Sequence, residues 1–453
     1  PPPPPPPPFS RRRRHTRLGR WSRGLGDVYK RQGVPGGIPA VPEQARVEQF
    51  GAKTDDGRDD SHAIAAAVKA VGERGGGAVV LGKGTYHLNS PIIITNDRVV
   101  IRGQGMDATR IVFHYVPVDD VAFFRPFPDD RVGPETWIEV HAAPKGGLKN
   151  FSLELDGKQV HEVPKRRLGN ENFVLRASGS LSTGLATGPQ SLKAIAEWKD
   201  GSHKEAEISV YVDPHHRLPV GQWRYPVHPK ASIAAFTFIG DKESGPTWKL
   251  ARDGLRGDVQ IELEAVPDLK AGDALLMVAP ATERWNELVR NASDRPDFRR
   301  YQFRVEEVDG RRVRLNQPLR IDFPVVDGST AQKITPIRRC GVENLTLHQT
   351  MKMWTTGILF LNAWECWAQD VKVLKAGRYP VYTRYAKWSE IRDCVFDDAW
   401  YHGGGGTAYV GWERSYDCLM DGVTTHRMRH APCVQWAAAG NVVRNSTFHN
   451  SDA

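Results

Sequence analysis

Hydrophobic and polar positions along the chain form one repeated pattern: an apolar residue, Asn or Asp two places later, and then a short alternating apolar stretch. Six segments carry it: LKNFSL, VENLTL, AQDVKV, IRDCVF, LMDGVT and VRNSTF. Their shared polar residues are Asn150, Asn344, Asp370, Asp393, Asp421 and Asn445. The last five are separated by 26, 23, 28 and 24 residues. Such an interval is too short for a helix pair and long enough for three short strands, so the pattern predicts a solenoid built from strands.

The shared Asn or Asp is expected to mark a corner, because both residues readily adopt left-handed or Asx-turn conformations. The residues that follow, such as Leu345 and Leu347 or Val371 and Val373, alternate and are expected to point into the core. Leucine-rich repeats have a similar period, but their Asn follows the Leu-rich strand, and Leu is not dominant here. The pattern therefore favours an all-β fold, a parallel β-helix in which each coil covers the next.

A different pattern precedes the repeats. Ser61 or Asp60 can cap a helix over residues 62–71, which the glycines of residues 75–77 end. Short strands are then predicted at residues 78–81, 85–88, 92–94 and 99–101. Four carboxylates precede the helix: Asp55, Asp56, Asp59 and Asp60. We interpret them as turn and helix-cap residues, with a cation site as the alternative.

This N-terminal stretch resembles the pectate-lyase-like superfamily of right-handed parallel β-helices. The resemblance rests on FGAKTDDGRDD, the Ala-rich helix, GGGAVVLGKGTYHL and VVIRGQG, within residues 49–113. It implies that the helix plugs the open end of the solenoid. It also implies a polysaccharide as partner, bound in a groove where successive coils each contact one sugar, and an exported or surface protein.

A long inserted region is expected between the first coils and the later repeats. Asn150 and Asn344 are 194 residues apart, which is far more than one coil. We therefore divide the chain into residues 33–156 with the cap and first coils, an insertion at 157–335, and further coils at 336–453. Within the insertion, residues 157–232 suggest a small β-sandwich and 233–335 a second β-rich element. Either could be a carbohydrate-binding module or a structural flank.

Charge does not point to nucleic acid. The formal net charge is +9, but residues 1–32 contain nine of the 62 basic residues and only one acidic residue, Asp27. The remaining 53 basic and 52 acidic residues nearly balance, so the body of the protein has no general attraction to phosphate. Residues 1–32 begin with eight prolines and resemble translated adapter sequence, and we expect them to be a non-native or disordered leader. No stretch of 18 apolar residues predicts a membrane span.

The remaining expectations concern the C-terminal end and the cysteines. The sequence stops directly after a repeat strand, so we expect further coils or a cap beyond Ala453. Five cysteines without CxxC spacing predict neither a zinc site nor a disulfide scaffold. Cys340 and Cys366 share one register and could stack on neighbouring coils, where a disulfide is an alternative to two buried thiols.

The densest polar segment is residues 391–436, which we take as the candidate site. Asp397 and Asp398 end a predicted strand, and His402 precedes four glycines at 403–406 that would allow a close ligand approach. Five residues are expected to be catalytic: Asp397, Asp398, His402, Arg429 and His430. Five more are expected to bind substrate: Glu413, Arg427, Gln435, Trp400 and Trp412. The alternative is structural, with corner residues at Asp393, Asp421 and Asn445 and tryptophans packed between coils.

Two mechanisms would use these residues. A polysaccharide lyase neutralises a uronate carboxylate, with calcium on acidic residues or with Arg or His, and a base then removes the C5 proton. Arg429 with His430 or His402 could do this. A glycosidase needs two carboxylates, which Asp397, Asp398 and Asp421 could supply.

Comparison with the motifs of the superfamily leaves the mechanism open. Polygalacturonases carry Asn-x-Asp, Asp-Asp, Gly-His-Gly and Arg-x-Lys in order. Here only Asp397-Asp398 and His402-Gly403 match, because Tyr401 replaces the first Gly and no Arg-x-Lys follows. We expect an enzyme that cleaves an acidic polysaccharide by β-elimination, with calcium as a candidate cofactor. A glycosidase and a non-catalytic carbohydrate-binding or adhesin-like β-helix are the alternatives.

Overall fold

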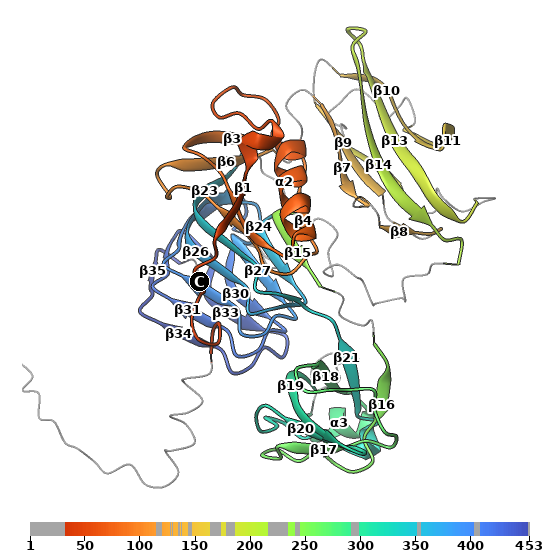
Figure 1. Ribbon diagram of the computed structural model, residues 1–453, viewed down its shortest axis with the longest axis vertical. Helices are drawn as coiled ribbons and strands as arrows, with labels where there is room; N and C mark the ends of the chain where they lie inside the picture. Colours follow the sequence, from red (N-terminus) through yellow and green to blue (C-terminus); the bar gives the residue numbers. More distant parts are fainter. Residues whose placement is uncertain are drawn as a thin grey trace, which may run out of the picture.

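The computed structural model is a parallel β-helix that carries two inserted β-domains (Figure 1). It describes residues 32–114, 120–126, 128, 130–134, 136, 138–143, 147–163, 174–177, 186–215, 234–240, 245–290, 299–350, 355–402 and 408–451. The predicted leader therefore lies outside the described residues, except for Gln32. None of the helices in these ranges is long and apolar enough to cross a membrane.

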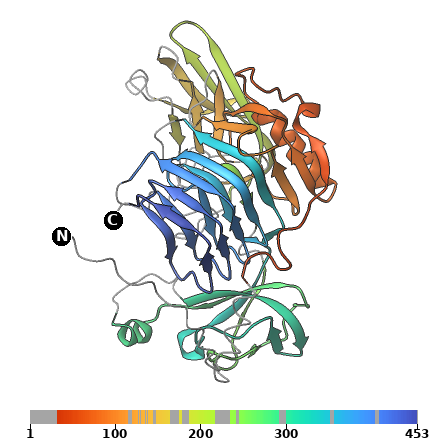
Figure 2. The same cartoon turned by 90° about the vertical axis from the view of Figure 1, so that its left-hand side faces the viewer.

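Three parallel faces run along the β-helix (Figure 2). Face 1 consists of β1 (Glu43–Arg46), β2 (Gly77–Val80), β5 (Val99–Arg102), the first halves of β23 (Gly341–Gln349) and β26 (Trp367–Ala376), β28 (Glu390–Arg392), β31 (Leu419–Asp421) and β34 (Val442–Arg444). Face 2 consists of β3 (Gly84–Leu88), β6 (Thr109–Phe113), the second halves of β23 and β26, β29 (Val395–Ala399), β32 (Thr424–His426) and β35 (Thr447–His449). Face 3 consists of β4 (Ile92–Ile94), β15 (Ala234–Ile239), β24 (Thr356–Leu361), β27 (Val381–Arg384), β30 (Tyr409–Glu413) and β33 (His430–Gln435).

A short fourth side closes each later coil. It begins with the parallel pair β22 (Ile337–Arg338) and β25 (Ala363–Trp364) and continues as single bridges through Lys387, Tyr416 and Ala439. The inward residues of all coils form one buried core, in which Leu345, Leu347, Val371 and Val373 take the predicted inward positions. The predicted all-β parallel β-helix is therefore confirmed.

The corner between faces 1 and 2 has the predicted chemistry. Asn344, Asp370, Asp393 and Asn445 have φ values of 57°, 51°, 50° and 50°, in the left-handed region that Asn and Asp tolerate. In the sixth coil the corner is Gly422, with φ 69°. The prediction of Asp421 as a corner residue is wrong by one position, because Asp421 pairs with Arg392 and Arg444 inside the face 1 strands.

The helix α2 (Ser61–Glu73) covers the open end of the first coil (Figure 1). Ile64, Ala67, Val68 and Val71 are buried against the core of the β-helix. A 3₁₀ turn, η1 (Val47–Phe50), precedes it. The N-cap position is Asp60, but its carboxylate does not cap the helix.

The four carboxylates before the helix fix turns through backbone amides. Asp60 accepts hydrogen bonds from the Lys53 and His87 amides at 2.9 and 3.0 Å. Asp55 accepts from the Thr85 amide, Asp56 from the Arg58 amide, and Asp59 from the amides of Ser61 and Asn89. Within the described residues no group of three or more His, Cys, Asp or Glu side chains is arranged to hold a metal ion.

The first inserted domain interrupts the second coil, between β6 and β15. It has a five-stranded sheet in the order β11-β10-β13-β14-β8 and a three-stranded sheet β12-β9-β7, with a core of its own. Its strands are β7 (Val121–Arg125), β8 (Arg131–Val132), β9 (Ile138–Ala142), β10 (Leu148–Leu155), β11 (Lys158–Glu162), β12 (Val174–Ala177), β13 (Gly188–Trp198) and β14 (His203–Val212). Asn150 lies in β10, which pairs antiparallel with β11 and β13, so its assignment to the solenoid repeat is wrong.

The second inserted domain follows β15 and precedes β22. Its six strands have the order β16-β21-β18-β19-β20-β17 and enclose a third core. Its elements are β16 (Thr247–Lys249), β17 (Gln260–Glu262), β18 (Ala274–Ala279), α3 (Glu283–Leu288), β19 (Arg299–Asp309), β20 (Arg312–Leu315), η4 (Val325–Asp327) and β21 (Thr330–Ile334). Because β15 pairs with β4 and β24, the chain returns to the β-helix between the two domains. The single insertion predicted at 157–335 is thus two insertions, and the first starts soon after Phe113.

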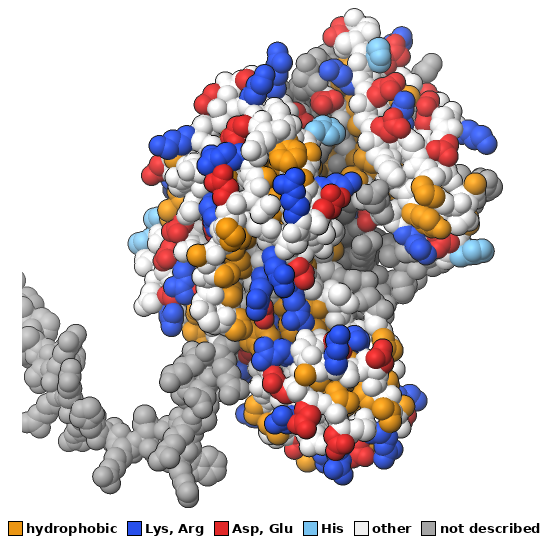
Figure 3. Space-filling model, in the orientation of Figure 1, with side chains coloured by type: hydrophobic (Ala, Val, Ile, Leu, Met, Phe, Trp, Pro, Cys, Tyr) orange, Lys and Arg blue, Asp and Glu red, His pale blue; other side chains and the backbone are white. Residues whose placement is uncertain are grey.

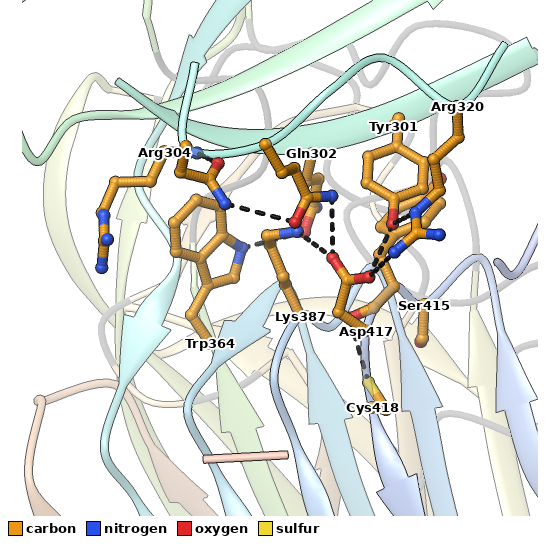
Figure 4. A network of polar contacts seen from close by, with 12 residues as sticks. Tyr301, Gln302, Arg304, Arg320, Trp364, Lys387, Ser415, Asp417 and Cys418 are labelled. Carbon is orange, nitrogen blue, oxygen red and sulfur yellow. Dashed lines mark hydrogen bonds and ion pairs between the residues drawn. The ribbon is translucent and has the colours of Figure 1, made fainter. Parts of the chain in front are cut away.

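The second inserted domain docks on the β-helix through a buried polar network (Figure 4). Asp417, fully buried, forms an ion pair with Lys387 at 2.5 Å and accepts hydrogen bonds from Tyr301 at 2.9 Å and Gln317 at 3.0 Å. Arg320 adds an ion pair to the same carboxylate at 2.8 Å. Three of these partners belong to the inserted domain, so the network fixes its position. Figure 3 shows Lys and Arg side chains gathered where the two bodies meet.

The five cysteines are free, and Cys340, Cys366, Cys394 and Cys418 are buried. The thiol of Cys366 donates to the Trp364 carbonyl at 3.3 Å, and that of Cys340 donates to the Arg338 carbonyl at 3.4 Å. Cys340 and Cys366 therefore serve as buried apolar positions on neighbouring coils.

Candidate functional site

The structure separates the predicted site residues into three places. Asp397, Asp398, His402 and Arg427 meet at the corner between faces 2 and 3. Glu413, Gln435 and His430 lie on face 3. Trp412 is in the core of the β-helix.

The first place is a compact charged group that we call the corner cluster: Lys375, Asp397, Asp398, His402 and Arg427. Asp397 and Asp398 end β29, and the Arg427 guanidinium from the next coil lies 2.5 Å from Asp397 Oδ1 and 3.5 Å from Asp398 Oδ2. Lys375, from the preceding coil, lies 2.5 Å from Asp398 Oδ2. His402 Nε2 lies 3.0 Å from Asp398 Oδ1. The carboxylate pair of one coil is thus held between Lys375 of the preceding coil and Arg427 of the next.

Backbone geometry explains why these residues meet. Lys375, Asp398 and Arg427 have φ values of 54°, 66° and 54°, so each turns the chain in the left-handed conformation at the same corner. The pairing of β26 with β29 and of β29 with β32 stacks these corners. Neighbouring strands are about 4.8 Å apart, which places charged side chains of successive coils within ion-pair distance.

Asp398 is held as a carboxylate. Burial alone would raise its pKa, but hydrogen bonds from Lys375, the Ala399 amide and His402 outweigh burial and lower the pKa of Asp398 to about 2. A carboxylate hydrogen-bonded to an imidazole fixes the orientation of the ring. The corner cluster can therefore orient His402 and place the cations Lys375 and Arg427 close to it.

Trp400 lies beside the corner cluster. Its indole Nε1 donates to the Gln349 carbonyl at 3.0 Å, and Lys375 Nζ lies 5.2 Å from its ring centroid. The ring is partly exposed, so one surface of it can contact a ligand next to Lys375. This position agrees with the predicted contact role without testing it.

Face 2 leads away from the corner cluster as a ladder of outward side chains. Successive strands place His348, Leu374, Asp397, His426 and His449 in one row. The rings of His426 and His449 stack with centroids 4.9 Å apart. An extended polymer lying along the β-helix axis could contact several of these side chains in turn.

Glu413 belongs to a buried ion cluster on face 3. Its carboxylate contacts Tyr382 Oη and Arg414, and Arg384 Nε lies 3.5 Å away. The Glu413 and Arg384 side chains are each 6% exposed. Three buried partners engage the oxygens of Glu413, so its carboxylate joins neighbouring side chains inside the molecule. Its place in the sequence did not indicate this burial.

Gln435, His430 and Arg429 lie near this buried cluster. Gln435 donates to Tyr379 Oη at 3.1 Å, and Tyr379 stacks on Tyr382 with ring centroids 4.3 Å apart. The His430 ring packs on Tyr409 at 4.7 Å. The amides of Arg429 and His430 both donate to the Ala408 carbonyl, and both side chains are half-buried.

The prediction that Trp412 binds substrate is wrong. Its side chain is 2% exposed and packs in the main core with residues such as Phe360 and Val410. The strand β30 alternates, so Val410 and Trp412 share the inward side, whereas Tyr409 and Glu413 lie on the outward side.

Sequence reasoning missed Lys375, which contacts Asp398 as closely as any predicted residue. The available signal was its spacing from Asp398, because 23 residues is the same interval that separates Asp370 from Asp393. The glycines at 403–406 lie outside the described residues.

Comparisons with known proteins concern the N-terminal segment and the overall fold. Residues 45–122 match a family model described as rhamnogalacturonase A/epimerase, pectate lyase-like. No protein with a curated description matches the chain. The tailspike protein gp49 from Pseudomonas phage LKA1 is 13% identical, with 89% of this chain and 51% of that chain covered and a TM-score of 0.48. The tailspike gp61 of Pseudomonas phage phi297 is 11% identical, with 91% and 50% covered and a TM-score of 0.45.

A third solved structure is the A-module of the mannuronan C-5 epimerase AlgE4 from Azotobacter vinelandii. It is 11% identical, with 89% of this chain and 56% of that chain covered and a TM-score of 0.34. The chain thus spans about half the length of the tailspikes it matches. The match at residues 45–122 includes α2 and the strands of the first two coils up to β6. It confirms the resemblance drawn from the sequence: the chain is a parallel β-helix protein whose residues 45–122 match that family model.

Proposed function

We propose that the protein is an exported enzyme that cleaves an acidic polysaccharide by β-elimination at the corner cluster. The observation that carries this proposal is the grouping of a histidine, its ionised carboxylate partner Asp398, and the cations Lys375 and Arg427 on an exposed corner. Elimination next to a uronate needs these components: a base, and positive charge that neutralises the substrate carboxylate.

The mechanism assigns one role to each group. Arg427 and Lys375 bind the uronate carboxylate and stabilise the negative charge that develops on it. His402, oriented by Asp398, removes the C5 proton. The electron pair forms the C4–C5 double bond, the C4–O bond breaks, and the leaving oxygen takes a proton from water. The Arg427 side chain is 54% exposed, so it can reach a substrate while it contacts the aspartates.

The lowered pKa of Asp398 argues against a hydrolytic mechanism that uses Asp398 as the acid. A glycosidase needs one carboxyl group that is protonated at the working pH, which requires a raised pKa. The pKa of Asp398 is lowered to about 2, so Asp398 cannot be that acid. Extended polysaccharide would lie along face 2, where the row through Asp397, His426 and His449 provides further contacts.

The test is an assay of residues 33–453 with acidic and neutral polysaccharides, with and without calcium. We expect an acidic polymer to give both new reducing ends and the ultraviolet absorbance of an unsaturated uronate. His402→Ala should lower kcat/KM by at least about 100-fold, in line with the loss of a general base. His62→Ala, which removes an exposed imidazole on α2, is the matched control and should leave the rate unchanged.

Other outcomes would replace the proposal. Reducing ends without unsaturated product would indicate hydrolysis, with Asp397 as the carboxylate to test. Deuterium uptake at C5 without chain cleavage would indicate an epimerase, a reaction that begins with the same proton removal. Binding without any chemistry would indicate a carbohydrate-binding β-helix. A strict calcium requirement would indicate that a metal ion, and not Arg427 and Lys375, neutralises the substrate carboxylate.

A further inference from the structure

A cleft of about 1050 Å³ lies between face 1 of the β-helix and the second inserted domain. One wall consists of side chains from β28, β31 and β34, and the other of side chains from β19, β20 and the residues that follow them. The N-terminal segment that includes Val34 and Gly37 borders it. The corner cluster is separate from this cleft, because it lies at the far edge of face 2.

Arginines on both walls give the cleft its charge. Arg304 and Arg314 come from the inserted domain, and Arg392 and Arg444 come from the β-helix. The only carboxylates among the described residues that line it are Glu306 and Glu390. Asn316, Gln317 and Trp388 supply amide groups and an aromatic ring between the arginines. Guanidinium, amide and aromatic groups together suit a polar ligand that carries carboxylates.

Arg314 is available for exchange, and Arg444 is partly exposed. Arg314 pairs with Glu307 at 2.8 Å, and both side chains are more than half exposed. Arg444 is about half exposed, but its partner Asp421, 2.7 Å away, is 9% exposed and is also contacted by Arg392 at 3.2 Å. A surface ion pair contributes only about 0–1 kcal/mol, so little is lost when Arg314 turns to another carboxylate. The planar guanidinium fork matches a carboxylate with two parallel hydrogen bonds.

Polar contacts join the inserted domain to the β-helix next to the cleft (Figure 4). Gln317, which lines the cleft, donates to the buried Asp417 of the docking network. Arg304 binds Glu306 through Nε and Nη2 at 3.1 and 2.9 Å, and its guanidinium lies 5.4 Å from the Trp388 ring of the β-helix. A cleft with fixed walls loses little entropy when a ligand binds.

From this arrangement we infer that the cleft is a second saccharide site, which binds a carboxylate-bearing segment of the polysaccharide away from the corner cluster. The inference rests on the proposed function for the acidic nature of the polymer. Two sites on one chain would hold a long polymer more tightly than either site alone, because the second binding event becomes intramolecular.

The test uses short acidic oligosaccharides of galacturonate, mannuronate, guluronate and glucuronate, with neutral oligosaccharides of equal length beside them. Binding is measured by calorimetry on the His402→Ala protein at low and high salt. We expect at least one acidic oligosaccharide to bind, more weakly at high salt because the contacts are ionic. Arg314→Ala and Arg444→Ala should each weaken binding by about tenfold, the effect of losing one charged hydrogen-bond pair.

Arg311→Ala is the matched control, because Arg311 is exposed on the same inserted domain, pairs with Glu262 at 3.3 Å and does not line the cleft. It should leave binding unchanged. Absence of binding by every acidic oligosaccharide would overturn the inference, as would binding that Arg314→Ala and Arg444→Ala leave intact. The proposed function fails differently: cleft variants should keep normal elimination of short substrates, whereas His402→Ala should lose it and keep cleft binding.

Discussion

Asp398 is the residue whose ionisation the structure controls most directly at the candidate site. Its pKa is lowered to about 2 by Lys375, the Ala399 amide and His402, against the opposing effect of burial. A lowered folded-state pKa stabilises the folded protein above the unfolded value of 3.8, and this stabilisation is lost as pH falls toward 2. Asp398→Asn should therefore lower the free energy of unfolding by about 2 kcal/mol at neutral pH.

The measurement is urea unfolding of the native protein and Asp398→Asn between pH 2 and 7. The difference between them should be constant above about pH 4 and shrink below it. Asp107→Asn, at an exposed position of the second coil, serves as the control. A difference that stays the same at pH 2 would show that Asp398 does not act through its charge.

The burial of Trp412 shows what strand parity could have predicted. If Val410 is taken as an inward residue of the segment TAYVGWE, the period of two places Trp412 inward as well. The sequence thus contained the information, but the density of polar residues around Trp412 suggested an outward position. Glu413 is different, because burial of its outward face depends on tertiary contacts that no local pattern reveals.

At the scale of the element, the corner between faces 1 and 2 depends on a single glycine in the sixth coil. Gly422 has φ 69°, and a Cβ there would lie 2.2 Å from Asp393 Oδ1 of the coil before it. Gly422→Ala should therefore combine left-handed strain with a steric clash, and we expect a loss of about 2–4 kcal/mol in the free energy of unfolding. Thermal and denaturant unfolding measure this loss.

Gly57→Ala provides a matched control, since Gly57 has φ 71° and nothing lies within 4 Å of a Cβ added there. It should cost only the left-handed strain, about 1 kcal/mol. Adding Asp393→Gly to Gly422→Ala should relieve the steric clash, because the Asp393 side chain is removed, but should leave the left-handed strain at position 422. Equal losses for the two alanine variants would contradict the proposed contact with Asp393.

The same corner explains one success and two errors of the sequence pattern. Asn344, Asp370, Asp393 and Asn445 could be found because a left-handed backbone selects Asn and Asp. Gly422 satisfies the same requirement without a polar side chain, which moved the predicted corner to its neighbour Asp421. The segment LKNFSL matches the repeat pattern by coincidence, because it lies in an antiparallel sheet of the first inserted domain.

At the scale of the whole molecule, the sequence predicted the solenoid but not how the chain leaves and re-enters it. The strand β15 completes the second coil by pairing with β4 and β24, although more than 100 residues separate it from β6. Its sequence AAFTFI carries no corner residue, so no repeat pattern identified it. Lys375 and the docking network were missed for a related reason, because their partners lie on other coils or in an inserted domain.

The docking network makes the position of the second inserted domain depend on one buried carboxylate. Ion pairs with Lys387 and Arg320 outweigh burial and keep the pKa of Asp417 below its usual value. Asp417→Asn would leave the fully buried Lys387 beside a neutral amide, which is expected to cost about 3–5 kcal/mol. Lys387→Met should cost less, because Tyr301, Gln317 and Arg320 still satisfy Asp417.

Hydrogen exchange measures how firmly the domain is held. It should show faster exchange of the β19 and β20 amides in Asp417→Asn, whereas the control Glu262→Gln, at the ion pair of β17 with Arg311, should leave these amides protected. Equal protection in all three variants would mean that apolar contacts alone hold the domain in place.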